Sequence, residues 1–461
     1  MTNPFFERMI AAFDLPANAD TLPSHSITGT GNLTSFFAVT DLAVAAIGAA
    51  GTMVSRYCSL QSGALMPLAI DRHLASLWFG MTLRPKGWQM PNPWDPIAGD
   101  YPTKDGWIRL HTNAPHHRAA ALSVLDNHTD RGGLLPVVAK WSANDLEAAI
   151  ISAGGCAATM RSLADWNHYP QGIAVAEEPL IHWQEHEGKE PVARAISPDR
   201  PLANIRVLDL TRVLAGPVAG RFLAAYGADV LRIDPPNWDE PGVIAEVTLG
   251  KRCAGLDLKS PDGRAHFEAL LRDADILLHG YRPDALPNLG YDTERLRAIN
   301  PNLITVTLNA YGWSGPWTKR RGFDSLVQMS SGIADFGMKM SGADKPVPLP
   351  VQALDHATGY LMAASALHGL YQRHHTGGVK TARLSLARVA HLLCSTAQTT
   401  TFGKPGPETP DDIAPLLEQT SWGPAHRIRF PLDIKDVPHR WKYPASKLRS
   451  SVATWGKRHF T

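Results

Sequence analysis

Cysteine is scarce in this sequence, with only four residues among 461. They are widely scattered, and none forms a Cys-x-x-Cys pair or a cysteine/histidine spacing that suits zinc. The scarcity argues against a disulfide framework and a zinc site, so we expect no metal and a reducing, cytoplasmic location. The four residues are Cys58, Cys156, Cys253 and Cys394.

An excess of charge of one sign is also missing. The 45 lysines and arginines nearly balance 43 aspartates and glutamates, which leaves a net charge of +2. Because there is no basic run and no patch of interleaved basic and aromatic residues, we expect no nucleic-acid partner. A hydrophobic content of 44% is ordinary for a globular protein, and the length predicts two to four domains.

Membrane and export signals are lacking as well. Residues 1–22 do not show the basic start and apolar core of an export signal. Residues 36–54 are apolar, but Asp41, two threonines and many alanines and glycines favour a buried helix over a membrane span. We therefore expect no membrane anchor.

The glycine fingerprint of dinucleotide-binding proteins is absent from the segment where it would be expected. Residues 207–210 have the pattern of a buried strand, residues 218–226 continue as a helix, and residues 229–234 form a second strand. This order predicts a parallel crossover whose ligand crevice lies at the carboxyl ends of the strands. However, Ala215-Gly-Pro-Val-Ala-Gly220 is not Gly-x-Gly-x-x-Gly, which argues against a nicotinamide or flavin site. We predict an α/β fold with a Rossmann-like parallel sheet.

The start of the expected helix contains two further signals. Thr211 is a candidate cap for the helix. Gly216, followed by Pro217, would let the backbone approach a ligand closely.

A second pattern in the sequence is an internal repeat. The segment that begins at Asp41 matches the segment that begins at Asp355, and at the same offset Gly63 falls on Gly377. Each copy has an aspartate near the start of a helix, a glycine turn and a second apolar segment. We interpret the two copies as a duplicated helical hairpin.

The region after the first copy is predicted to be a small mixed domain. Asp105-Gly106 is a hairpin turn, residues 107–112 alternate as a strand, and residues 143–153 are helical. We divide the chain into an N-terminal extension (1–30), the first repeat copy (31–90), a small α+β domain (91–176), a linker (177–202), the large sheet domain (203–394) and a C-terminal tail (395–461).

Taken together, these residues resemble the class III CoA-transferases, which include the formyl-CoA:oxalate and carnitine CoA-transferases. The resemblance covers nearly the whole chain after residue 30, but the order of the parts departs from the family, as if two truncated copies had been fused. It rests on residues 207–217, Gly227-Ala-Asp-Val230, Gly250-Lys-Arg252, Leu256-Asp-Leu-Lys259, Ala274-Asp-Ile-Leu277, Arg282-Pro283, Asn300-Pro-Asn-Leu-Ile304, Gly312-x-x-Gly-Pro316, Gly322-Phe-Asp324, the Asp355 helix, Asp105-Gly-Trp-Ile108 and Pro170-Gln171.

The resemblance implies that Asp355 is the nucleophile, followed four residues later by Gly359. A carboxylate suits this role because, at its usual pKa of about 3.9, it is ionised at pH 7 without an activating base. The local sequence alone favours a helix N-cap role for Asp355, and both roles can coexist. Asp41 has Ala45 in place of the glycine, and we interpret it as a structural vestige.

The resemblance also implies that coenzyme A is a substrate and that no cofactor is permanently bound. We expect the backbone amides of Ala215 and Gly216 to meet a phosphate or the reacting carbonyl. Lys251, Arg252 and Arg282 are predicted to follow strands, where they could bind phosphate; a solvated surface role is the alternative for each.

Two other functions remain in competition. Racemases with this fold carry a histidine where this sequence has Phe323, so one of the two bases that racemisation needs is absent. His356 is expected to be a packing or polar surface residue. A catalytically silent CoA-binding subunit stays open because the order of the domains is rearranged and partly deleted. Two departures from active transferases point the same way: only Gly80 and Gly87 stand where oxalate-specific members have a glycine-rich loop, and Leu214 stands where some members have a glutamine.

The partners expected from the resemblance are an acyl-CoA and a carboxylic acid whose identities the sequence leaves open. Family members form interlocked dimers, so we expect a homodimer. The site would then lie between the sheet domain and the small domain of residues 95–175, paired within one chain or between two.

Overall fold

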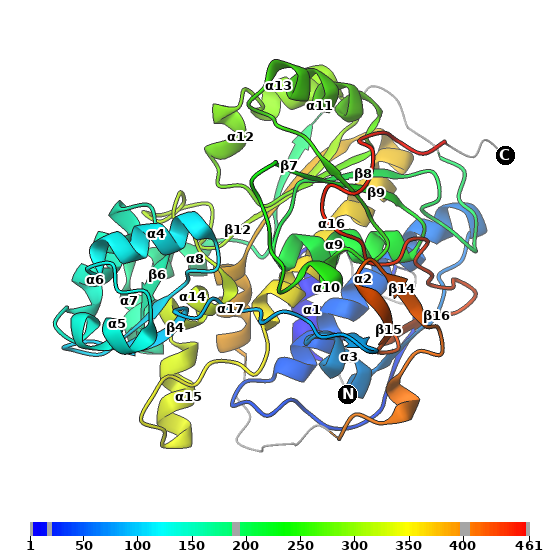
Figure 1. Ribbon diagram of the computed structural model, residues 1–461. Helices are drawn as coiled ribbons and strands as arrows, with labels where there is room; N and C mark the ends of the chain where they lie inside the picture. Colours follow the sequence, from blue (N-terminus) through cyan, green and yellow to red (C-terminus); the bar gives the residue numbers. More distant parts are fainter. Residues whose placement is uncertain (1–2, 16–20, 187–193, 397–405, 458–461) are drawn as a thin grey trace.

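The computed structural model describes residues 3–15, 21–186, 194–396 and 406–457. Its centre is a seven-stranded sheet in the order β10-β9-β8-β11-β12-β13-β7, parallel except for the antiparallel β7 at one edge (Figure 1). The strands are β7 His182–His186, β8 Arg206–Asp209, β9 Asp229–Asp234, β10 Arg252–Gly255, β11 Ile276–His279, β12 Ile304–Asn309 and β13 Val379–Ser385. The predicted α/β class and mainly parallel sheet are confirmed.

Helices cover both faces of this sheet, because its strands are apolar on both sides. Val207 of β8 packs on the face covered by α9 (Ala215–Ala225) and α16 (Ala353–Thr376). Its neighbour Leu208 packs on the other face, which α11 (Pro261–Asp273) and α13 (Thr293–Ile299) cover (Figure 1). Two short helices and two longer ones complete this region: α10 Ile244–Val247, α12 Ala285–Asn288, α14 Asp324–Ser330 and α15 Ile333–Ser341.

The two repeat copies have the same structure, and it is not a helical hairpin. In each copy a 24-residue helix ends at a glycine with a positive φ, then a strand and a second helix follow. The second apolar segment therefore starts as a strand, which the local sequence did not reveal. The first copy is α2 (Val39–Ser62), β2 (Leu68–Asp71) and α3 (Arg72–Trp78), and the second is α16, β13 and α17 (Leu386–Cys394).

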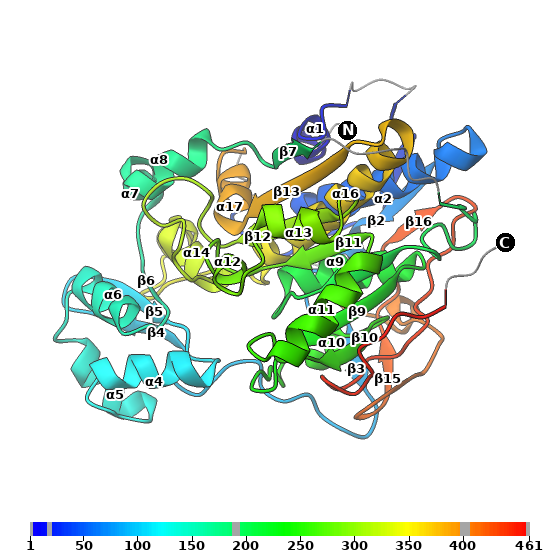
Figure 2. The same ribbon diagram turned by 90° about the horizontal axis from the view of Figure 1, so that it is seen from above.

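The small mixed region has its own sheet and apolar core. Strands β4 (Gly99–Pro102), β5 (Trp107–Leu110) and β6 (Ala157–Thr159) pair antiparallel, with the expected turn between the first two. The core includes Tyr101, Ile108, Leu134 and Ile150. Figure 2 shows the helices α4, α5 and α6 of this region on the side of the molecule away from α2. The helices are α4 Pro115–Val124, α5 Arg131–Val138, α6 Ala143–Ser152, α7 Leu163–His168 and α8 Pro170–Glu177.

The remaining elements come from the two ends of the chain and lie against the first repeat copy. A sheet in the order β1-β2-β16 combines residues from both ends, and another has the order β14-β15-β3. Helix α1 packs on α2. The bounds are α1 Pro4–Ala11, β1 His25–Thr28, β3 Leu83–Pro85, a short 3-10 helix Pro410–Asp412, β14 Glu418–Thr420, β15 Gly423–Arg427 and β16 Leu432–Ile434.

Candidate active site

A pocket of about 380 Å³ lies at the carboxyl end of the parallel sheet, where such folds bind ligands. The loops after β8, β11 and β12 form it, together with the first turns of α9 and α16 and one end of α4. Its polar lining residues include His116, His117, Thr211, Arg212, Tyr281, Arg282, Asn309, Arg320, Arg321 and Asp355. A smaller cavity of about 200 Å³ shares Val213, Trp238 and Phe323 with this pocket.

Asp355 is the carboxylate that lines the pocket, and only 8% of the residue is exposed. It stands in the first turn of α16 rather than at its cap, since Gln352 is the N-cap residue. The alternative that Asp355 caps its own helix is therefore wrong. Instead the side chain of Asp324 accepts a hydrogen bond of 2.9 Å from the Asp355 amide.

This arrangement places two carboxyl groups together. Burial, and then the neighbouring Asp324, raise the pKa of Asp355 well above its usual range. Burial raises the pKa of Asp324 to about 6, although Gln328 donates a hydrogen bond to it. The expectation that Asp355 has the usual carboxyl pKa of about 3.9 is thus not met, because it assumed a solvated carboxyl. Sequence reasoning quoted Asp324 only as part of a motif and missed its effect on Asp355.

Gly359 explains how α16 approaches the start of α9 so closely. A Cβ atom at this position would lie 2.3 Å from the backbone oxygen of Ala215 and 2.7 Å from the Cβ of Val218. Only a glycine permits that approach. It brings the first amides of α9, which have no partner within the helix, to the same pocket as Asp355.

The loop between β8 and α9 contains a strained residue, whose backbone is held by a hydrogen bond. Val213, a β-branched residue, has a φ of 64°, which is rare for such a side chain. Its amide donates to Glu240 over 2.9 Å. Thr211 does not cap the helix as expected, since its hydroxyl donates to Asp209 and the N-cap position belongs to Leu214.

Gly216 serves the packing of this loop. A Cβ atom there would lie 2.3 Å from side-chain atoms of Thr211. The Thr211 side chain therefore leaves room only for glycine at this position, whereas the sequence suggested a close approach to a ligand.

Of the three predicted phosphate-binding cations, only Arg282 lines the pocket. It follows β11, as predicted, and its ion pair with Asp284 is long, at 3.7 Å. Sequence reasoning missed three other arginines. Arg212 follows β8 and donates to the hydroxyl of Tyr281, while Arg320 and Arg321 come from the loop after β12. That loop has no helix or strand pattern from which its position could be predicted.

The structure places Lys251 and Arg252 elsewhere. Lys251 is completely buried and binds Asp209 over 2.8 Å. Arg252 is the first residue of β10, and it pairs with Asp229 and donates to the backbone of Thr454. Both were predicted to follow a strand, but the strand begins at Arg252, so they lie at its amino end, and neither lines the pocket.

Histidines from the small region reach the pocket from its far wall. His111 stacks on Phe323 with 3.7 Å between ring centroids, and His117 lies 5.9 Å from the same ring. Burial lowers the pKa of His117 to about 4, so its ring is neutral at pH 7. Among the described residues, neither nitrogen of His117 has a hydrogen-bond partner.

The contacts of Asp41 and His356 indicate structural roles for both residues. The Asp41 carboxylate is 39% exposed and forms a 2.6 Å ion pair with Arg72. His356 is buried, not on the surface, and stacks on Phe79, which agrees with a packing role. Burial lowers its pKa to about 3.

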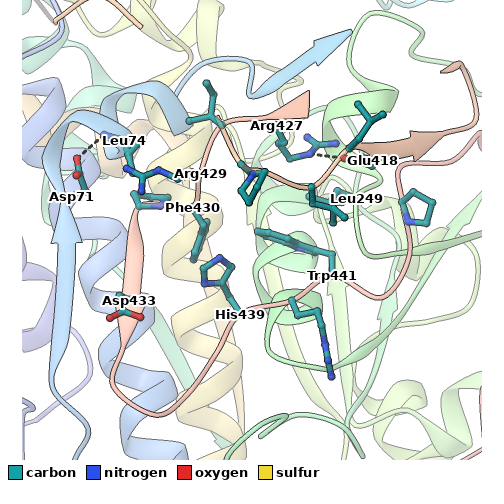
Figure 3. A pocket seen from close by; sticks show the side chains of 18 of the residues that line it. Asp71, Leu74, Leu249, Glu418, Arg427, Arg429, Phe430, Asp433, His439 and Trp441 are labelled. Carbon is teal, nitrogen blue, oxygen red and sulfur yellow. Dashed lines mark hydrogen bonds and ion pairs between the residues drawn. The ribbon is translucent and has the colours of Figure 1, made fainter. Parts of the chain in front are cut away.

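A larger cavity of about 840 Å³ lies away from Asp355, between the first repeat copy and the C-terminal tail (Figure 3). Phe430, His439 and Trp441 lie along it, and Asp71 and Leu74 also line it. Because no residue of the Asp355 pocket lines this cavity, its size alone does not make it the reaction centre.

Two absences apply to the part of the chain that the structure describes. No helix there has the length and apolarity to span a bilayer. Nor do its histidine, cysteine and acidic side chains form a cluster that could hold a metal ion.

Most residues of the Asp355 pocket lie in a segment that is similar to known proteins. The family model described as CoA-transferase family III matches residues 202–415. The chain is 35% identical over 178 residues to a succinate–glutarate CoA-transferase of Agrobacterium fabrum, covering 34% of this chain and 44% of that protein. It is 31% identical over 191 residues to a formyl-CoA:oxalate CoA-transferase of Rhodopseudomonas palustris, covering 39% and 44%.

A probable fatty acyl-CoA transferase of Mycobacterium tuberculosis, Rv3272, is 32% identical over 208 residues, covering 42% of this chain and 52% of that protein. A crystal structure of Rv3272 overlaps 43% of this chain and 56% of that chain with a TM-score of 0.40. The chain thus spans about half the length, or less, of the curated relatives it matches. The segment of residues 202–415, which contains Asp355, thus matches CoA-transferase family III.

Proposed function

We propose that this protein moves CoA between an acyl-CoA thioester and a carboxylic acid, with Asp355 as the nucleophile. The observation that carries the proposal is the position of Asp355. Its carboxyl group lines a pocket at the carboxyl end of the sheet, beside the first residues of α9 and within the segment that matches the family. The names of the relatives support the same class of reaction.

The reaction would proceed in four balanced steps. First, a carboxylate oxygen of Asp355 attacks the thioester carbonyl, the carbon–sulfur bond breaks, and CoA leaves as a thiolate. Second, the thiolate attacks the Asp355 carbonyl of the resulting anhydride and releases the donor acid, which leaves an aspartyl-CoA thioester. In the third step the acceptor carboxylate attacks this thioester and expels the thiolate. In the fourth, the thiolate attacks the acceptor carbonyl, which yields the new acyl-CoA and frees Asp355.

The surroundings of Asp355 suit these steps. Amide N–H groups at the start of α9 can donate to the oxygen on which negative charge develops. Arg212, Arg282 and Arg321 line the same pocket and provide positive charge for the CoA phosphates. No water is consumed and no electrons are transferred, so the reaction requires coenzyme A only as a substrate and no resident cofactor.

The reaction requires Asp355 to be ionised, but the free protein disfavours its ionisation. The attacking group must be a carboxylate, while burial and Asp324 favour the neutral acid. Arginines and helix amides around a bound thioester favour the carboxylate. We therefore expect the rate of the first step to rise with pH as Asp355 loses its proton.

The experiment that tests this function is covalent trapping. The protein is incubated with succinyl-CoA, acetyl-CoA and similar thioesters, quenched with hydroxylamine, digested and mapped by mass spectrometry. We expect a hydroxamate on the peptide that contains Asp355, the same signal in Asp41→Asn, and none in Asp355→Asn.

Other outcomes would lead to other functions. A hydroxamate on Asp41 would move the site to the first repeat copy. CoA binding without modification by any donor would favour a silent CoA-binding subunit. Exchange of the α-hydrogen of an acyl-CoA in heavy water, without thioester exchange, would favour racemase-like chemistry.

A further inference from the structure

The repeat copies correspond element by element. Helices α2 and α16 begin and end 314 positions apart, and so do the starts of α3 and α17. The N-caps also correspond, since the side chain of Asp71 caps α3 and that of Ser385, 314 positions later, caps α17. The two segments are thus copies of one structural unit.

The strands beside each copy correspond as well. In the order β1-β2-β16, the repeat strand β2 has a parallel neighbour and an antiparallel one. Strand β13 likewise has one parallel neighbour, β12, and one antiparallel neighbour, β7. Ala69 of β2 pairs with Asp433, and its repeat equivalent in β13, Arg383, pairs with His182.

The antiparallel strands are exchanged between the copies. Strand β7 follows the first copy along the chain, yet it pairs with β13 of the second. Strand β16 follows the second copy, yet it pairs with β2 of the first. Such reciprocal exchange is typical of two subunits that are intertwined.

The long helices of the two copies also form the contact that joins them. Helices α2 and α16 pack along each other, and nearly all of α2 up to Cys58 is buried. A Cβ at Gly51 of α2 would lie 2.9 Å from Leu432 of the exchanged strand. The face of α16 against which another subunit could pack is therefore covered by the chain itself.

The first half of the chain also completes the walls of the Asp355 pocket. Gln171 binds backbone groups of Tyr311, Ser314 and Trp317 in the loop after β12. Glu147 of α6 forms a 2.9 Å ion pair with Arg320, which lines the pocket. The small region is thereby docked onto the sheet domain of its own chain.

In the first copy, the residues equivalent to those of the Asp355 pocket do not form a corresponding site. Leu386 lines the open pocket with Asp355, but its repeat equivalent is Arg72, whose guanidinium binds Asp41. Thr28, which stands where Asn309 does in the second copy, lines the large cavity of Figure 3, and Asp41 does not.

From these observations we infer that the first half of the chain serves as an internal partner subunit, so that the protein is a fused pseudo-dimer. One chain contains one complete site, formed by the sheet domain of its second half and the small region of its first half. This replaces the homodimer implied by the resemblance. The assignment of the site rests on the proposed function, whereas the internal pairing does not.

The test uses the full chain with a protease cleavage site inserted between His186 and Arg194. Light scattering is measured before and after cleavage, and binding of coenzyme A is measured by calorimetry. We expect the mass of one chain, 50.1 kDa for the natural sequence. We also expect one CoA per chain, and after cleavage two fragments that still co-elute and bind CoA.

Three results would overturn the inference: a mass twice that of one chain that persists on dilution, fragments that separate after cleavage, or two CoA molecules per chain. The proposed function fails independently of these results. A monomer without any aspartyl adduct would remove the transferase chemistry and keep the pseudo-dimer, and a dimer that forms the adduct would do the reverse.

Discussion

Asp355 and Asp324 form a pair in which one carboxyl group controls the other. Asp324 holds the first turn of α16 by accepting hydrogen bonds from backbone amides, and its charge raises the pKa of Asp355. The same residue therefore positions the proposed nucleophile and, together with burial, favours its protonated form in the free protein. Binding of a thioester would have to shift this balance toward the carboxylate.

Replacing Asp324 with Asn is predicted to move the acidic limb of the pH–rate profile to lower pH. The amide keeps an acceptor for the Asp355 N–H, but it removes the negative charge that raises the pKa of Asp355. Asp355 then ionises at a lower pH, so the rate rises earlier as pH increases. Thioester exchange measured across pH checks this, with Asp335→Asn as a control because Asp335 pairs with Lys339 on the outer helix α15. An unchanged limb in Asp324→Asn would contradict the coupling of the two carboxyl groups.

Individual residues were predictable where a motif coincided with a strand end. Arg282 belongs to such a motif, whereas Asp355 was predicted at the start of a helix, and both line the pocket. Lys251 was misplaced because its motif precedes a strand whose start the sequence pattern did not mark. Arg320 and the histidines of the small region could not be predicted, because they reach the pocket only through docking of segments far apart in sequence.

At the scale of elements, the crossing of α9 and α16 shapes the pocket. The two helices meet at Gly359, where the backbone of Ala215 leaves no room for a side chain. The first repeat copy has Ala45 at the equivalent position of α2. The difference between these two residues offers a matched pair of variants.

We expect Gly359→Ala to lower the free energy of unfolding by about 1–3 kcal/mol, as overpacking does, and to weaken CoA binding because the start of α9 must move. The matched Ala45→Gly should cost about 1 kcal/mol through helix propensity alone and leave CoA binding unchanged. Urea unfolding and calorimetry measure the two effects. CoA binding by Gly359→Ala with parental affinity would show that the close approach does not shape the site.

A buried ionic cluster joins the large domain, the first repeat copy and the tail. Glu246 of α10 pairs with Arg221 of α9 and Arg427 of β15, and it accepts hydrogen bonds from Thr82. Burial opposes the charge of Glu246, but the two arginines outweigh it and lower its pKa to about 2. The cluster therefore contributes stability only while Glu246 is ionised.

Replacing Glu246 with Gln should destabilise the fold by about 3 kcal/mol at pH 7, since a buried charge pair loses one partner. A lowered pKa stabilises the fold above the unfolded value of about 4.3, and this contribution falls as pH drops toward 2. The loss caused by the substitution should therefore shrink in acid. Urea unfolding at several pH values checks this, and the exposed pair of Glu268 with Arg295 provides the control, for which Glu268→Gln should cost under about 1 kcal/mol. Equal losses in the two variants would contradict the role of the cluster.

At the scale of the whole molecule, the repeat was the most informative feature of the sequence. The exchange of strands between its two copies, however, could not be seen in the sequence. The offset from Asp41 to Asp355 predicted two copies, and the structure has two 24-residue helices at that spacing. The strand exchange could not be predicted, because β7 and β16 are short and their pairing depends on the whole fold. Local patterns do not say which copy a strand will join.

The central claim is that Asp355 becomes covalently loaded, and the rate of thioester exchange in Asp355→Ala tests it most directly. Exchange of labelled CoA between an acyl-CoA and free acid is followed in the parent, in Asp355→Ala and in Asp41→Ala. We predict that exchange disappears in Asp355→Ala while CoA still binds, and that Asp41→Ala exchanges at the parental rate. Exchange by Asp355→Ala as fast as by the parent would contradict the account.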